Sequence, residues 1–477
     1  MTAAFVWKHV PGAIHLLRPA PGAQCTTPSS ISNHQAIKHD TSRLELYAPF
    51  VQSLEAYCPL IEEHWDQSLW RTYPLQTQQP VNFPKLRRLT YTSPEEKAEK
   101  DQLGYLLPFL SSSLREIEIT ACNGCLLWQS LSSVSKFLNV VSSQCPKLES
   151  LRIYPGQPSS NAELNEDFER ATFTDDALAM HQTMNSFRGL RELAISPAVL
   201  EPNVLRAVSS YPYLETLIIR SKAYGGPVYD EYDLDDTSFP ALQRLELIDL
   251  DPHVMKKLSD VKRLLCGLEH ASIQFGPGSN TAWGFSGDRA DSLFSLVKYC
   301  PNLTELKFDI GESKEAVSIP KLTDLFRPRP LRSVSLTASV SLTEHAGWAE
   351  LFGALPLVEE LHLPRNGFQY PELRNFAIML PRLHSLWVYY LDFRPDIWTI
   401  AKDLESVPNP SQIPLRFRLN IDIFKLVKDY KIVARCLHVL WPNVVIDIKP
   451  HPLSPTNIVA ADFSKTINRV LRELSAS

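Results

Sequence analysis

The sequence is poor in glycine, with 17 glycines among 477 residues, whereas it contains 37 prolines. This composition predicts chain reversals made at prolines rather than flexible glycine-rich linkers. Long apolar runs are missing too, because charged residues interrupt them well before the ~20 residues that a membrane helix needs. The N-terminal apolar run contains Lys8 and His9 and lacks a small-residue cleavage site, so it does not resemble a secretory signal. We therefore expect a cytoplasmic or nuclear protein.

An excess of charge of one sign is also absent. Lys and Arg total 48 against 53 Asp and Glu, a net charge of −5, and no cationic stripe is present. Nucleic acids and anionic membranes are therefore not expected as partners. The hydrophobic share of 44% and charged share of 21% are typical of a folded protein. Since single cores stop growing near roughly 250–300 residues, the chain must divide into domains or extend by repetition.

Cysteine is too scarce for a disulfide scaffold, with eight in the chain. Cys58, Cys145 and Cys300 each precede a proline, and this recurrence favours buried thiols that pack as small hydrophobic groups. Cys122 and Cys125 form a single C-x-x-C pair, whereas a structural zinc site needs four ligands. No metal and no cofactor is predicted.

Catalytic motifs are missing as well. The sequence contains no H-E-x-x-H, no Walker A loop and no G-x-G-x-x-G. Residues 284–287 (GFSG) are one residue short of a nucleophile elbow. No catalytic residue is assigned, and we do not expect an enzyme.

What the sequence does contain is one recurring phrase, Pro-x-Leu-x-x-Leu-x-Leu, with other apolar residues at the leucine positions. The first leucine-type position of each of eleven copies falls at residues 86, 114, 148, 190, 214, 242, 268, 303, 331, 358 and 383. Seven of the ten successive intervals lie between 24 and 28 residues, within the period of leucine-rich repeats. The pattern predicts an α/β leucine-rich-repeat solenoid, with a curved parallel sheet lined by helices on its convex side.

Helical patterns separate the phrases. Residues 128–143 and 343–355 place apolar side chains at three- and four-residue spacing, and Glu201-Pro202 and Asp251-Pro252 are typical helix starts. Polar stretches at 155–176, 229–236 and 276–287 are predicted to be surface loops; the acidic one, 229–236, is either a solvated loop or a docking segment. Residues 415–423 and 444–448 predict the last strands. The apolar stripe that begins at 459 predicts a helix that caps the solenoid or binds a partner.

Because side chains alternate along a strand, residues between the inward leucines should face the concave surface. Arginine and large aromatic residues dominate interface hot spots, so we expect a protein to bind there. The predicted partner-binding residues are Arg152, Tyr154, Arg220, Lys307, Asp309, His362, Trp387 and Tyr389. Trp387 and Tyr389 lie two apart on one strand and either anchor the partner or pack beneath the C-terminal segment.

Several phrases, including CPKLESLRI, YPYLETLIIRS and LPRLHSLWVYY, resemble the irregular repeats of F-box/leucine-rich-repeat proteins from mushroom-forming fungi. Phe5, Val6 and Trp7 begin a segment, continuing to Val10, that resembles the last few residues of an F-box, where a Leu-Trp-basic phrase closes the last helix. The opening Leu-Pro-x-Glu phrase of that family is missing. On this resemblance, residues 1–18 are the end of an F-box, 19–42 a linker, 43–450 the solenoid and 451–477 a tail with an amphipathic helix.

In that family the F-box binds the Skp-type adaptor of a cullin-type ubiquitin ligase, and the repeats hold the substrate. The resemblance implies a substrate receptor with impaired adaptor docking, in which Phe5, Val6 and Trp7 are the remaining docking residues. Three origins stay open: a shortened gene model, a splice form, or a relative that has lost docking. The alternative function is a leucine-rich-repeat scaffold with no ligase role.

Overall fold

The computed structural model describes residues 8–11, 18–19, 39–40, 46–56, 83–93, 102–121, 128–156, 178–221, 232, 234–275, 288–311, 316–340, 346–392, 413–420, 430–449 and 457–476. The chain divides into two compact units, residues 1–242 (unit 1) and 243–477 (unit 2). Each unit is a stack of strand–helix repeats, so the predicted leucine-rich-repeat fold is confirmed.

Unit 1 contains seven described parallel strands of the repeat sheet. In spatial order they are β1 (His9–Pro11), β4 (Ser53–Glu55), β5 (Arg88–Ser93), β6 (Glu116–Ala121), β8 (Ser150–Arg152), β10 (Glu192–Ile195) and β11 (Thr216–Arg220). Two short pairs lie beside the sheet: β2 (Arg18–Pro19) with β3 (His39–Asp40), and β7 (Trp128–Ser130) with β9 (Tyr154–Gly156). The described helical elements include η3 (Ala48–Phe50), η4 (Gln102–Phe109), α4 (Leu131–Gln144), η6 (Pro197–Leu200) and α6 (Pro202–Ser209).

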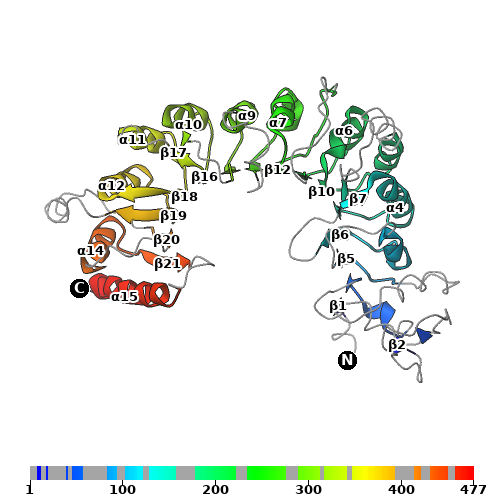
Figure 1. Cartoon of the computed structure of the whole chain (residues 1–477), viewed down its shortest axis with the longest axis horizontal. Coiled ribbons are helices and arrows are strands. Elements are labelled where there is room, and N and C mark those ends of the chain that lie inside the picture. Colours follow the sequence, from blue (N-terminus) through cyan, green and yellow to red (C-terminus); the bar gives the residue numbers. More distant parts are fainter. Residues whose placement is uncertain are drawn as a thin grey trace, which may run out of the picture. The chain divides into compact units, whose positions relative to one another are not determined.

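Unit 2 contains eight described parallel strands of the repeat sheet, and in Figure 1 its helices follow the outer side of the arc that these strands make. The strands are β12 (Arg244–Ile248), β13 (His270–Gln274), β14 (Glu305–Asp309), β16 (Ser333–Thr337), β18 (Glu360–Gln369), β19 (Ser385–Asp392), β20 (Arg416–Asn420) and β21 (Val445–Lys449). A short pair joins β15 (Ala316–Val317) to β17 (Ser339–Val340). The described helices are α7 (Pro252–Ser259), α8 (Lys262–Leu265), α9 (Asp288–Val297), α10 (Ile319–Phe326), α11 (Ala346–Gly353), α12 (Tyr370–Met379), α14 (Tyr430–Leu440) and α15 (Asn457–Ala476).

The periodic leucines form the core, as predicted. In each unit one side chain from every strand of the repeat sheet occupies the same register position and is no more than 9% exposed. These ladders run Val10, Leu54, Leu89, Ile117, Leu151, Leu193 and Leu217 in unit 1, and Leu245, Ala271, Leu306, Val334, Leu361, Leu386, Phe417 and Ile446 in unit 2. Burying each large aliphatic side chain contributes ~1.5–3 kcal/mol, which a single strand–helix unit could not obtain alone.

The prolines close the turn that precedes each strand. The carbonyl of Phe83 accepts the N–H of Leu86 across Pro84 (3.2 Å), and the carbonyl of Cys145 accepts the N–H of Leu148 across a proline in the same way (3.1 Å). Proline fits the second position of such a turn because its φ is already set. The residue before the proline then faces the core, so Cys145 and Cys300 are buried as predicted. Burial raises their thiol pKa values to about 11 and about 12.

The helices begin and face as the patterns predicted. Pro252 opens α7 after Asp251, whose carboxylate accepts the N–H of His253, and Pro202 opens α6 after Glu201. The apolar stripe of residues 128–143 is the buried face of α4, although Trp128 itself begins β7. Of the predicted surface loops, all of 276–287, residues 157–176 of the first and residues 229–231 and 233 of the acidic one lie outside the described residues.

The first and last described strands of the repeat sheet, β1 and β21, have different surroundings. The helix expected after residue 459 is α15, and it caps β21: the Asn468 side chain pairs with both the N–H and the carbonyl of Ile446 (2.9 and 2.8 Å). At the other end, the resemblance implied the end of an F-box helix. There His9–Pro11 form strand β1, in register with β4, with Val10 buried against the core. Phe5, Val6 and Trp7 lie outside the described residues.

Candidate protein-binding surface

The sheet face away from the helices, which we call the distal face, is the one predicted to be concave. It carries the side chains that alternate with the leucine ladder, and they are half-buried or exposed at most positions. In unit 1 the row next to the ladder runs Glu55, Thr90, Glu118, Arg152, Ala194 and Ile218. In unit 2 the equivalent row runs Glu246, Ser272, Lys307, Ser335, His362, Trp387, Arg418 and Asp447.

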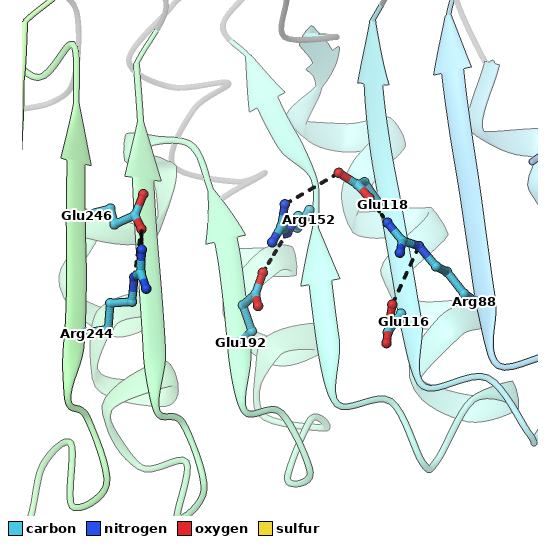
Figure 2. Close-up of polar contacts among 7 residues, drawn as sticks. All are labelled: Arg88, Glu116, Glu118, Arg152, Glu192, Arg244 and Glu246. Atoms are coloured by element: carbon cyan, nitrogen blue, oxygen red, sulfur yellow. Dashed lines mark hydrogen bonds and ion pairs between the residues drawn. The ribbon is translucent and has the colours of Figure 1, made fainter. Parts of the chain in front are cut away.

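In unit 1, arginines and glutamates of neighbouring strands pair across this face, as Figure 2 shows. Glu118 of β6 lies between Arg88 of β5 (2.8 Å) and Arg152 of β8 (3.5 Å). Arg152 also pairs with Glu192 of β10 through Nε (2.6 Å), and Arg88 approaches Glu116 (3.6 Å). These side chains are 22–51% exposed, so the network adds little to stability. Its effect is to hold the guanidinium groups in fixed positions on the surface.

The charge state of Arg152 follows from this network. Burial alone would lower its pKa, but the hydrogen bond and the charge of Glu192, with the charge of Glu118, raise it. Arg152 is therefore a permanently charged group whose orientation is set by two carboxylates. A partner would meet it already ordered, with little side-chain entropy left to lose.

The structure brings the predicted residues Arg152, Tyr154 and Arg220 close together, but not all of them are exposed. Tyr154 is 6% exposed and packs on Ala194, with Ile218 beside them. Burial raises the pKa of the Tyr154 hydroxyl, and the nearby positive charges of Arg220 and Arg152 partly offset this increase. The sequence signal for this burial was the pair of apolar residues, Ala194 and Ile218, at distal positions. A partner would contact the two arginines rather than the tyrosine ring.

In unit 2, Lys307 and Asp309 lie two apart on β14 and do not join the aromatic residues, because Ser335 separates Lys307 from His362 in the row. Lys307 is exposed. Asp309 is half-buried, and its carboxylate accepts the N–H of Gly311 (2.9 Å), which shapes the turn after the strand. Lys307 is therefore available to a partner, whereas Asp309 already has a local structural role.

The predicted aromatic residues of unit 2 form a larger cluster than the sequence indicated. His362, Trp387 and Arg418 occupy successive strands in exact register. The His362 and Trp387 rings meet edge to face at 5.8 Å, and the Arg418 guanidinium lies 5.4 Å from the centre of the Trp387 ring. Arg418 also pairs with Asp447 of β21 (3.1 Å). Such edge and cation contacts fix the orientation of an aromatic ring.

Trp387 and Tyr389 are both half-buried, so neither is a core residue. Burial lowers the pKa of His362; the Glu360 charge opposes this shift and the Arg418 charge adds to it. Arg418 and Asp447 were not among the residues predicted from the sequence. The alternation of residues 415–423 placed Arg418 on the distal face, but the long interval before β20 hid which tryptophan it would meet.

Among the described residues no group of three or more His, Cys, Asp or Glu side chains is placed to hold a metal ion. No described helix combines the length and the apolar character needed to cross a membrane. Cys122 and Cys125, the single C-x-x-C pair, lie outside the described residues.

No protein-family model matches the chain, and no curated protein matches it either. Among solved structures it is similar to the leucine-rich repeat-containing protein LegL7 from Legionella pneumophila, with 13% identity and a TM-score of 0.38 over 81% of this chain and 98% of that one. The Rad7 and Elc1 complex in yeast gives 15% identity and a TM-score of 0.32 over 70% and 85%. A TLR13–ssRNA13 complex gives 12% identity and a TM-score of 0.32, over 84% of this chain and 59% of that one. The fold assignment rests on the backbone ladders of the chain itself.

Proposed function

We propose that this chain binds another protein through the distal face of its repeats, in the cytoplasm or nucleus, and has no catalytic activity. The observation that carries the proposal is the row of His362, Trp387 and Arg418. Tryptophan and arginine are the residue types that contribute most to protein interfaces, and here both are held in place on a sheet whose other face is the core. The pre-ordered arginines of unit 1 support the same use.

The finer proposal is a substrate receptor related to F-box subunits of cullin-type ubiquitin ligases, with impaired docking to the Skp-type adaptor. The repeat phrases that resemble this family support it. The alternative, a scaffold with no ligase role, is favoured by the observation that His9–Pro11 belong to the repeat sheet rather than to an F-box helix.

Binding to the adaptor tests the impaired docking that the first of these functions assumes. We expect the purified chain to bind a purified Skp-type adaptor weakly or not at all, because only Phe5, Val6 and Trp7 resemble docking residues. Isothermal titration calorimetry with the two proteins measures this directly. Tight, stoichiometric binding would contradict the expectation of impaired docking and would establish a ligase subunit.

Site-specific photo-crosslinking tests the distal face itself. A photoreactive phenylalanine derivative at Ser335, which lies beside His362 in the distal row, should form adducts with a partner in a cell extract. The matched position is Lys321, exposed on helix α10 of the same unit, where we expect none. The Ser335 adduct should also weaken when Trp387→Ala is introduced. Equal adducts from both positions, or adducts insensitive to Trp387→Ala, would argue against distal-face binding.

A further inference from the structure

The last three strands of the repeat sheet in unit 2 carry a surface whose contents differ from the rest of the distal face. We call it the Trp387 patch, and it consists of Trp387 of β19, Arg416 and Arg418 of β20, and Val445 of β21. Trp387 and Arg418 are adjacent in one register row, and Arg416 and Val445 are adjacent in the next. Neighbouring strands are ~4.8 Å apart, so all four side chains fall within reach of one short peptide segment.

The two arginines of the patch differ in charge balance. Arg418 shares its charge with Asp447 and lies over the Trp387 ring. Arg416 is exposed and forms no ion pair with any residue that the structure describes. The positive charge of Arg418 is therefore already compensated by Asp447, and its guanidinium covers part of the aromatic ring. The exposed guanidinium of Arg416, in contrast, can donate hydrogen bonds to a carboxylate of a partner. Guanidinium groups suit carboxylates because of their planar, two-pronged geometry.

The apolar part of the patch points to the second feature of the partner. Val445 is 57% exposed, beside Arg416 in register, and only a few other large hydrophobic side chains are this exposed in the described residues. It is a distal side chain of β21, the outermost strand of the sheet among the described residues. The half-buried Trp387 ring extends this apolar surface by one strand.

We propose that the Trp387 patch binds a segment of a partner protein that carries an Asp or Glu next to a large aliphatic or aromatic residue. The carboxylate pairs with Arg416, and the apolar side chain covers Val445 and the Trp387 ring. This inference rests on the proposed function and adds the chemistry of the partner. Single-stranded RNA, the other ligand that stacks on aromatic and arginine side chains, is disfavoured by the carboxylates Glu305 and Glu360 in the same register row as Arg416, which repel phosphates.

The test uses the full purified chain and a displayed library of random linear peptides. We expect the selected peptides to be enriched in Asp or Glu adjacent to Leu, Ile, Phe or Trp. A synthetic peptide of the selected consensus should bind Arg416→Glu at least about tenfold more weakly, and Trp387→Ala by a similar factor. A peptide with Lys in place of its acidic residue should regain binding to Arg416→Glu. The matched control is Arg435→Glu, an exposed arginine on helix α14, which should bind like the unchanged chain.

The outcomes separate the two levels of inference. No selected peptide, selection without acidic residues, no charge-swap recovery with Lys, or preferential binding of a single-stranded RNA oligonucleotide overturns the assignment of the patch. If the selected peptides instead lose binding to Arg152→Glu but not to Arg416→Glu, distal-face binding stands and the Trp387 patch is not its site. If no distal substitution changes the binding of the selected peptides while Arg435→Glu does, both proposals fail together.

Discussion

Replacing Trp348 by alanine is expected to lower the free energy of unfolding by about 3–5 kcal/mol. Trp348 is fully buried in unit 2, where its ring stacks on Phe352 (5.6 Å, 22°) and meets the edge of Phe368 (4.8 Å). Phe376 closes the cluster against both phenylalanines, at 4.2 and 5.0 Å. The rings come from α11, β18 and α12. The cavity left by Trp348→Ala would therefore weaken the packing of two neighbouring repeats at once.

The matched variant is Trp348→Phe. The indole Nε1 has no hydrogen-bond partner within the part of the chain that the structure describes, so this change removes ring volume but no hydrogen bond. We therefore expect a clearly smaller loss than for alanine. Tyr213→Ala, at a position 57% exposed in unit 1, should change stability by no more than ~0.5 kcal/mol. Guanidinium unfolding followed by far-UV circular dichroism measures all three. An alanine variant within about 1 kcal/mol of the unchanged chain would show that the cluster is not a packing centre.

The core was predictable because repetition supplies many independent copies of one signal. Leu89, Leu217 and Leu361 come from different phrases, and each occupies the predicted inward position. A degenerate copy, such as the one that lacks the proline before Leu114, keeps the same strand register because the neighbouring repeats fix it. Burial patterns in a stacked array are in this sense determined locally.

The candidate surface was less predictable, because it depends on contacts between strands rather than within one. Alternation alone placed Trp387 on the distal face, but the position of Arg418 over its ring depends on the pairing of β19 with β20 across an insertion. Tyr154 shows the opposite failure. The two-residue period put it outward beside Arg152, whereas its burial over Ala194 involves a different strand.

The C-terminal cap gives the second large effect. In the outermost described strand, β21, the N–H of Val445 bonds to the carbonyl of Leu415, immediately before β20. The N–H and carbonyl of Ile446 therefore point to the free edge. Asn468 of α15 accepts from that N–H and donates to that carbonyl, and Ser464 donates to the same carbonyl (3.1 Å). An unpaired strand edge is a template for association with another chain, and the Asn468 side chain occupies this edge of β21.

Asn468→Ala is therefore expected to cost about 1–3 kcal/mol and to promote self-association through β21. Asn468→Asp removes only one of the two hydrogen bonds. Its carboxylate still accepts from the N–H of Ile446, but it cannot donate to the Ile446 carbonyl and places negative charge against it. It should protect the edge no better than alanine, although its side-chain volume is nearly unchanged. Arg469→Ala, the exposed neighbouring position, is the control. Guanidinium unfolding and light scattering after size-exclusion chromatography give the two readouts. If Asn468→Ala stayed monomeric and as stable as Arg469→Ala, apolar packing of α15 through Ile467 and Leu471 would be sufficient to cap the sheet.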